Sequence, residues 1–304
     1  MATYRLVTRK QVKPTVPTEY KVLSPFYLAW RRFRKNKLAI LGGVIVFLFL
    51  FTGVFAPIIS PYPFDKTSIY TFAPPGTLAG HPLGTDDAGR DFLSRLIWGA
   101  NTSLIVGVTS MTFALLVGIV LGFLAAWYKG TIDFVVNRML EIVGSMPGLL
   151  FQILIMTMIG NGTLNVTFAI AILSWPGMVR LVRAQVLSYK DREFVEASRS
   201  MGANTRFIAL RHIVPNIINP ILVSIAFCIP GFMVAEAGLS FLGYGINDPT
   251  PSWGKMLGNA GQYVQSFIYL GAYPTALLMI VFIGFSFFGD GVRDALDPSS
   301  ERIV

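Results

Sequence analysis

The sequence contains little charge, one cysteine and two histidines, and these shortages exclude several classes of protein. Charged residues make up 13% of the 304 positions, about half the share found in a typical soluble domain. A single cysteine excludes an internal disulfide and a cysteine-rich metal site, and two histidines give no basis for a histidine-rich metal centre. The chain also lacks the G-x-x-x-x-G-K-[ST] segment that cradles phosphates, so we do not expect it to bind ATP itself.

What the sequence has instead is 53% hydrophobic residues, gathered in long uncharged runs. A helix needs about 20 mostly apolar residues to cross the hydrocarbon core of a bilayer, where every backbone group must be satisfied within the protein. Six runs reach or approach this length, and the last also has room for a surface segment. They are 38–59, 103–127, 142–159, 164–179, 217–235 and 256–289. The sequence therefore predicts an all-α polytopic membrane protein with six transmembrane helices.

The lysines and arginines indicate how these spans are oriented. With the spans placed as above, 21 of the 25 fall on one side of the membrane and 4 on the other. Because the side rich in Lys and Arg is the cytoplasmic one, both termini are predicted to lie in the cytoplasm. The same distribution accounts for the net charge of +9 without nucleic acid as a partner.

The segment 1–37 is predicted to be a basic cytoplasmic tail, with an amphipathic helix over 24–37 lying at the inner surface of the lipid bilayer. Its last basic residues, next to the first span, are Arg31, Arg32, Arg34, Lys35 and Lys37. We interpret them as an orientation signal at an anionic leaflet, with a specific lipid or protein site as the alternative. Beyond the first span, a five-helix core is expected over 103–292 and a cytoplasmic tail over 293–304.

Two long loops are predicted on the outer side, over 60–102 and 244–267. The first contains HPLGTDDAGRD, whose acidic residues and histidine admit two interpretations; they are His81, Asp86, Asp87 and Asp91. These residues could ligate a metal ion, but short acidic side chains also cap turns and helices, here a helix over 92–98. We favour the capping role and expect no metal site.

The cytoplasmic segment 188–216, SYKDREFVEASRSMGANTRFIALRHIVPN, combines features that a plain solvated loop does not need. Phe194, Ala197 and Met201 share one face of a predicted helix, and Gly202 is placed to end it because glycine adopts the left-handed cap without strain. Next, Asn204 can cap a second helix, which Pro215 is expected to close before the fifth span. The segment thus predicts two short helices joined by a sharp turn and projecting from the membrane.

This segment resembles the EAA loop of ABC-importer permeases, in which Glu-Ala-Ala precedes a glycine and, further on, Leu-Pro. Glu196, Gly202 and Pro215 match the spacing of that motif. The departures from it are Ser198, His212 and Val214. Other runs look like the dipeptide/oligopeptide/nickel permease family, and within it the C-type subunit: WRRFRKNKLAIL, HPLGTDDAGRD, LSRLIWGA, EAGLSFLG, PSWG and DALDP.

The resemblance implies the type I permease fold in the cytoplasmic membrane of a bacterium or archaeon. It further implies a homologous B-type permease, two cytoplasmic ATPases and an extracytoplasmic substrate-binding protein as partners. ATP and Mg²⁺ would be used by the ATPases, and this chain would hold no catalytic residue and no cofactor. The residues expected to couple the chain to an ATPase are Phe194, Glu196, Ala197, Met201, Gly202, Arg206, Arg211 and Pro215. Those expected to receive the binding protein are Asp87 and Trp253.

Three alternatives to an ATP-driven peptide permease were weighed. The same machinery could import nickel, a sugar or another small solute. A secondary transporter independent of ATP is disfavoured, because the carboxylates Glu141, Glu236 and Asp290 lie near the ends of their spans and not at mid-membrane. An intramembrane protease is disfavoured because the chain lacks H-E-x-x-H and G-x-S-x-G.

Two of these carboxylates are candidates for the pathway or gate. Glu141 either lines the pathway or pairs with Arg138, which lies one helical turn before it, and we favour pairing. Glu236 either contacts a substrate amine or hydrogen-bonds a loop at the outer gate, and the sequence leaves these two roles open.

Overall fold

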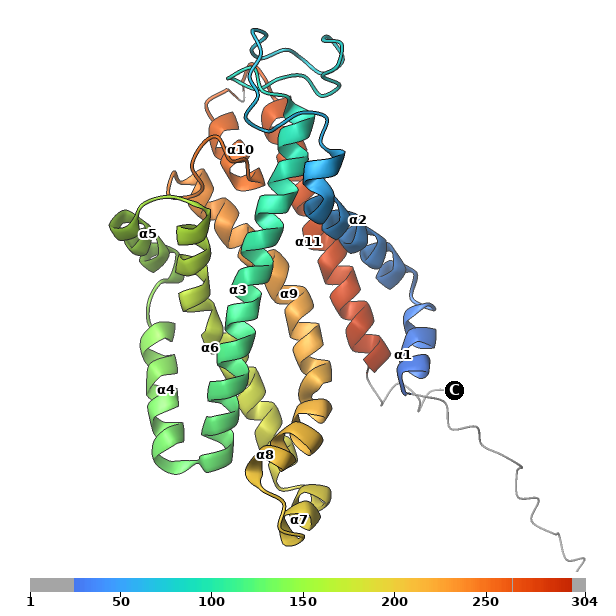
Figure 1. Cartoon of the computed structure of the whole chain (residues 1–304), viewed down its shortest axis with the longest axis vertical. Coiled ribbons are helices and arrows are strands. Elements are labelled where there is room, and N and C mark those ends of the chain that lie inside the picture. Colours follow the sequence, from blue (N-terminus) through green and yellow to red (C-terminus); the bar gives the residue numbers. More distant parts are fainter. Residues whose placement is uncertain (1–24, 264, 297–304) are drawn as a thin grey trace, which may run out of the picture.

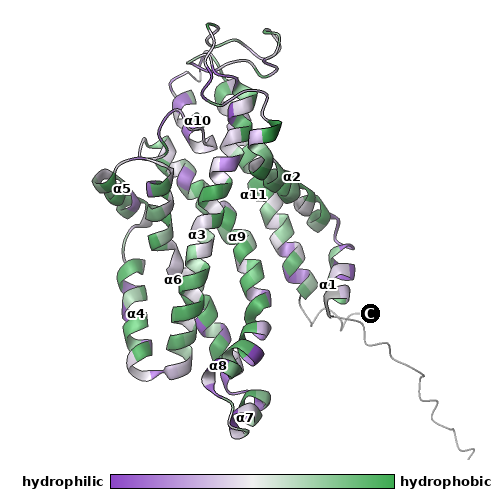
Figure 2. Ribbon diagram, in the orientation of Figure 1, coloured by the Kyte–Doolittle hydropathy of each residue, from purple (hydrophilic) through white to green (hydrophobic). Residues whose placement is uncertain are grey.

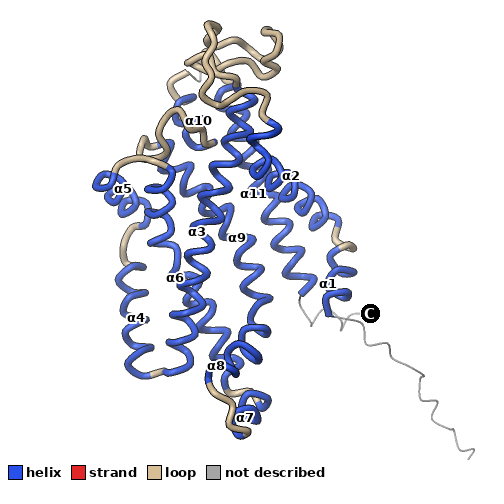
Figure 3. The backbone as a smooth tube through the Cα atoms, in the orientation of Figure 1, coloured by secondary structure: helices blue, strands red, loops and turns tan. Residues whose placement is uncertain are grey.

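The computed structural model describes residues 25–263 and 265–296, and the regular structure in these ranges is helical (Figure 3). The predictions for 1–24 and for 297–304 lie outside the described residues. In chain order the elements are α1 (Pro25–Phe33), α2 (Lys37–Ile59), α3 (Phe92–Tyr128), α4 (Gly130–Gly144), α5 (Gly148–Ile159), α6 (Thr163–Lys190), α7 (Glu193–Ser200), α8 (Thr205–Ile208), the π-helical turn η1 (Ala209–Ile213), α9 (Val214–Phe241), α10 (Trp253–Ala260) and α11 (Tyr269–Leu296).

The long helices form an elongated bundle, with the loop 60–91 at one end and α7 and α8 at the other (Figure 1). We call these ends the cap end and the coupling end. Within the described residues, five helices are long and apolar enough to cross a membrane, and the pair α4 and α5 makes a sixth if the two count as one bent span. The all-α polytopic fold predicted from the sequence is confirmed.

Helix α3 is the longest of the described helices, and it runs along the bundle from the cap end toward the coupling end (Figure 1). It has 37 residues, and at 1.5 Å per residue it extends about 55 Å. The predicted short helix over 92–98 and the predicted span over 103–127 are therefore one helix, and the outer loop ends at residue 91. The fourth span likewise continues beyond Arg180, as far as Lys190.

Small residues let these helices pack closely, as they do in many membrane proteins. A Cβ atom added to Gly118 of α3 would lie 2.2 Å from Cγ of Met178 on α6. Likewise, a Cβ added to Gly42 of α2 would lie 2.6 Å from the carbonyl oxygen of Gly284 on α11. Close helix contacts thus explain the glycines at these two positions.

The third span is not the continuous helix that we predicted over 142–159. Helix α4 ends at Gly144, α5 begins at Gly148, and the two are bent by 84°. The cause lies in the intervening residues, because Pro147 has no N–H to continue the ladder and disfavours helical geometry at Met146. Figure 1 shows α4 returning along the bundle and α5 turning away from its axis.

Hydrophobic residues, green in Figure 2, predominate along the long helices of the bundle. Large side chains such as Phe47, Leu116 and Met279 are exposed on the outer helices. A water-soluble protein of this size rarely exposes apolar surface on this scale, whereas a bilayer solvates it.

The first and last described helices also lie against each other, since the ring of Phe33 on α1 lies 5.8 Å from that of Phe288 on α11.

Candidate functional site

The coupling end carries the predicted helix–turn–helix, which we call the coupling loop (residues 191–213). Helix α7 ends at Ser200, and Gly202 follows with φ of +82°. The N–H of Gly202 bonds to the carbonyl of Arg199 at 2.9 Å, and the Asn204 side chain caps α8 by accepting from the N–H of Phe207 at 2.8 Å. The predicted glycine stop and asparagine cap are both confirmed.

Helix α7 has two faces with different surroundings. Val195 and Ser198 are buried against the bundle, where Val195 joins the cluster that includes Val186 of α6 and Ile208 of α8. The three residues predicted to form the apolar face toward an ATPase are on the exposed side of the helix: Phe194 is 40% exposed, Met201 is 81% exposed, and Ala197 is exposed as well. The predicted apolar face is thus free of contacts that would bury it within the described chain.

The polar residues assigned to coupling are also on the surface of the loop. Glu196, Arg206 and Arg211 are all exposed, and none forms an ion pair with another described residue. The ring of His212 lies 6.1 Å from that of Phe194 and 5.7 Å from that of Phe207, so it links the two arms of the loop. The contact with an ATPase itself stays a prediction.

Pro215 does not close the second helix as we predicted. The chain remains helical from Thr205 to Phe241, and it passes through the π turn η1 just before α9 begins at Val214. Proline is tolerated in the first turn of a helix because its missing N–H would have no partner there. The wider π turn ahead of Pro215 lets α8 run on into α9, which joins the loop directly to the fourth of the five long helices.

At the cap end, two buried arginines tie the loops 60–91 and 242–252 to α3. Arg90 Nε lies 2.7 Å from Asp86 Oδ2, and Arg95 Nε lies 3.2 Å from the same oxygen. Arg95 Nη1 also donates to the carbonyls of Phe64 and Pro249 at 3.2 and 3.1 Å. The sequence did not predict this role for Arg95, although an arginine among the apolar residues of LSRLIWGA was a signal.

Neighbouring carboxylates stabilise the positive charge of Arg90. Burial opposes that charge, but the ion pair and hydrogen bond with Asp86, together with nearby Asp87 and Asp248, outweigh burial and raise the pKa of the guanidinium. The guanidinium of Arg90 therefore stays charged across the physiological range, and it holds Asp86 next to the start of α3.

The acidic run before α3 acts as a set of caps, as we favoured. Asp91 Oδ2 accepts from the N–H of Ser94 at 2.7 Å and so caps α3. Its other oxygen lies 2.8 Å from Nδ1 of His81. Asp86 Oδ1 accepts from the N–H groups of Ala88 and Arg90, both at 2.9 Å.

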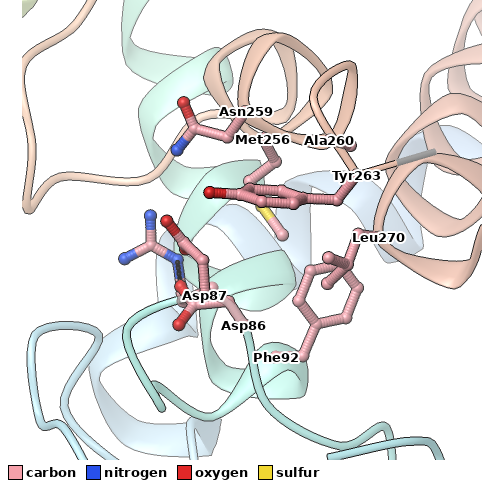
Figure 4. A pocket seen from close by; sticks show the side chains of 9 residues that line it. Asp86, Asp87, Phe92, Met256, Asn259, Ala260, Tyr263 and Leu270 are labelled. Atoms are coloured by element: carbon pink, nitrogen blue, oxygen red, sulfur yellow. Dashed lines mark ion pairs between the residues drawn. The ribbon is translucent and has the colours of Figure 1, made fainter. Parts of the chain in front are cut away.

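The two residues predicted to receive a binding protein differ sharply in their positions. Asp87 is partly exposed and lines a small cavity opposite Tyr263 and Asn259 (Figure 4). Trp253 is only 2% exposed, because its ring fills the space beside Gly99 and its Nε1 donates to the Leu96 carbonyl at 2.9 Å. The prediction that Trp253 forms part of a docking surface is therefore wrong for this conformation.

The two carboxylates assigned to the pathway or gate are also distinct. Glu141 pairs with Arg138 on the surface of α4 at 2.5 Å, which confirms the pairing that we favoured. Glu236 is fully buried, and its Oε1 accepts from Ser240 and Ser252, both at 2.7 Å. Since Ser252 is the N-cap of α10, Glu236 holds the second outer loop, which is one of the two roles left open.

These features together define a class of protein: a helical membrane protein with a structured cap at one end and an exposed coupling loop at the other. Residues 118–302 match the family model described as binding-protein-dependent transport system inner membrane component. Residues 24–75 match the model of the N-terminal TM domain of oligopeptide transport permease C. The chain therefore belongs to the family of binding-protein-dependent transport permeases, and its predicted likeness to the C-type subunits is confirmed.

Individual relatives extend over nearly the whole chain. A dipeptide transport system permease protein DppC of Alkalihalophilus pseudofirmus is 37% identical over 96% of both chains. An oligopeptide transport system permease protein OppC of Bacillus subtilis is 37% identical, covering 93% of this chain and 92% of that one. A glutathione transport system permease protein GsiD of Pectobacterium atrosepticum is 35% identical, over 95% of this chain and 97% of that one.

The fold also matches solved structures. Inward-facing conformations of the MetNI methionine ABC transporter superpose with a TM-score of 0.55 at 18% identity, covering 67% of this chain and 96% of that one. This likeness shows the fold alone.

Proposed function

We propose that this chain is one of the two permease subunits of an ATP-driven importer that carries short peptides across the cytoplasmic membrane. The observation that carries the proposal is full-length similarity to permeases named for dipeptide, oligopeptide and glutathione transport. All three names denote peptides or a peptide-like molecule, so a peptide backbone is the chemistry that these relatives share.

The proposed partners are those that the resemblance to ABC-importer permeases implies. A homologous B-type permease would pack beside the chain, two ATPases would bind on the cytoplasmic side, and a substrate-binding protein would dock outside. The exposed apolar face at Phe194, Ala197 and Met201 supports an ATPase contact, since a surface of this kind at the tip of a polar loop favours a protein partner.

The proposed orientation places the coupling end in the cytoplasm. It rests on the distribution of lysine and arginine, which favours that side 21 to 4. The chain itself would bind no cofactor and catalyse no reaction, and ATP and Mg²⁺ would be bound by the ATPases. Alternating exposure of a pathway between the two permeases would then move the substrate.

The substrate class is tested with the complete complex in proteoliposomes that hold ATP inside and the binding protein outside. Labelled dipeptide, tripeptide, glutathione, a disaccharide and Ni²⁺ are offered in turn. We expect uptake of at least one of the peptide substrates and none of the disaccharide or of free Ni²⁺. Uptake of the disaccharide or of Ni²⁺ without any peptide uptake would contradict peptide transport.

A further inference from the structure

The C-terminal end of α3 carries a tryptophan that lies close to two cations from other helices. The ring of Trp127 lies 5.5 Å from Nζ of Lys190, the last residue of α6, and 5.3 Å from Cζ of Arg199 on α7. Cations at these distances are attracted to the face of an indole ring. One aromatic side chain thus joins α3, α6 and the first helix of the coupling loop.

The ring is held in place from the α3 side as well. Lys190 Nζ donates to the carbonyl of Ala126 at 3.1 Å and also to that of Trp127, which satisfies carbonyls that a helix end leaves free. A lysine is also favourable at this end because of the helix dipole. Stacking on Phe123 at 5.4 Å fixes the indole from the preceding turn.

Helix α3 differs from the other four long helices in one respect. Each of those contains an internal proline, and the positions are Pro57 in α2, Pro176 in α6, Pro220 and Pro230 in α9, and Pro274 in α11. The 37 residues of α3 contain none, and internal proline is the commonest cause of a sharp kink. Among the described spans, α3 is therefore the one built to move as a straight rod.

The other end of the same rod anchors the cap. Asp91 caps its first turn, and Arg95 in its second turn binds the carbonyls of Phe64 and Pro249 in the two outer loops. The indole of Trp253 donates to the α3 carbonyl of Leu96. A displacement of α3 must therefore reach both outer loops.

We propose that Trp127 and Arg199 form the joint through which the coupling loop moves α3, and that α3 transmits this motion to the outer cap as a rigid strut. This inference rests on the proposed function, because it assumes that an ATPase moves the coupling loop. Trp127 and Arg199 act as positioning residues: they touch neither substrate nor nucleotide, and they set where α7 lies relative to α3.

The transport test compares matched pairs of variants in the complete complex. Arg199→Lys and Trp127→Phe keep a cation and a ring, whereas Arg199→Gln and Trp127→Leu remove them. Arg192→Gln, which removes another exposed cation of the coupling loop, is the control. Readouts are assembly, basal ATP hydrolysis, hydrolysis stimulated by the loaded binding protein, and peptide uptake.

We expect all variants to assemble with basal hydrolysis close to that of the wild type. Arg199→Gln and Trp127→Leu should lose about fivefold or more in stimulated hydrolysis and in uptake, the lower end of typical coupling effects. The two conservative variants and the control should keep both activities. Wild-type transport by Trp127→Leu, or equal loss in the conservative and disruptive variants, would overturn the inference.

A distance measurement separates this inference from the proposed function. Spin labels are placed on Tyr128→Cys at the end of α3 and Ser200→Cys on α7, in a Cys228→Ser background that removes the single native cysteine. The distance between the labels should stay constant between the nucleotide-free and ATP-trapped complexes, and its distribution should broaden in Arg199→Gln. If the distance between the two labels changes with nucleotide in the otherwise wild-type complex, the proposal that Trp127 and Arg199 hold α7 to α3 is overturned, even if transport is normal. A complex that transports no peptide refutes the proposed function instead.

Discussion

Ser252 donates a hydrogen bond to Oε1 of Glu236 at 2.7 Å, and this contact joins the cap end of α9 to the N-cap of α10. Glu236 is fully buried, so a carboxyl group inside the bundle organises a loop at its surface. The same oxygen accepts from Ser240 at 2.7 Å. The arrangement explains why EAGLSFLG and PSWG, which are separated in sequence, form one unit.

This relationship predicts a difference between two substitutions of Glu236. Glu236→Gln keeps an oxygen that can accept from both serines, so the complex should keep its stability and transport. Glu236→Ala leaves both buried hydroxyl groups without that acceptor, at roughly 1–3 kcal/mol. Thermal unfolding of the purified complex should show a lower Tm for Glu236→Ala only. Equal Tm values for Glu236→Ala and the wild type would contradict the assigned role.

Removing Arg95 should damage the cap more than removing one of its partners. Arg95→Met leaves Asp86 with one fewer cation and leaves two carbonyls unpaired, and breaking a buried pair typically costs about 3–5 kcal/mol. Asp248→Asn should have a small effect, since the Asp248 side chain is 49% exposed. Limited proteolysis of loop 60–91 measures how well each variant keeps the cap folded. Equal resistance to the protease in both variants would count against the role of Arg95 in holding the cap.

Gly202→Val should uncouple the complex without preventing its assembly. The backbone at Gly202 has φ of +82°, where a β-branched side chain costs roughly 1–2 kcal/mol, and the second arm of the coupling loop should shift. Glu196→Ala is expected to act in the same direction. Stimulated ATP hydrolysis and peptide uptake should fall together while the binding protein still docks.

The control for this prediction is Gly177→Ala on α6, where an added Cβ meets no atom within 4 Å and φ is not positive. It should transport at the wild-type rate. Normal transport by an assembled Gly202→Val complex would show that the turn is not needed for coupling.

The position of the binding protein can be mapped with photo-crosslinking side chains in the cap. A crosslinker at Asp87, whose side chain is 34% exposed, should capture the substrate-binding protein. The same group at buried Trp253 should not capture it. If the crosslinker at Asp87 captures only the partner permease, the cap packs within the complex and does not receive the binding protein.

The sequence was sufficient for features set by local chemistry. Uncharged runs placed the long helices, and the residue types at Gly202 and Asn204 identified a helix stop and a helix cap. Local rules were not sufficient to predict what the two prolines do to their helices. Pro147 breaks a span, whereas a π turn accommodates Pro215 within a continuous helix. Both prolines disfavour a helix locally, and packing decides the outcome.

Contacts between distant segments could not be predicted from one sequence. The bridge from Arg95 to Phe64 and Pro249 joins positions separated by 31 and 154 residues. The sequence predicted Trp253 as a docking residue, but its ring is buried in the space beside Gly99. Such positions depend on which helices meet, and apolar periodicity does not specify that.

The central claim is that this chain moves peptides only as part of an ATP-driven complex. The most direct measurement is the uptake of labelled peptide into proteoliposomes that contain this chain, the partner permease and both ATPases, with the binding protein added outside. We predict uptake only when ATP, the binding protein and this chain are all present, and none when an ion gradient replaces ATP. Uptake that an ion gradient drives without ATP, or that persists when this chain is left out, would contradict the account.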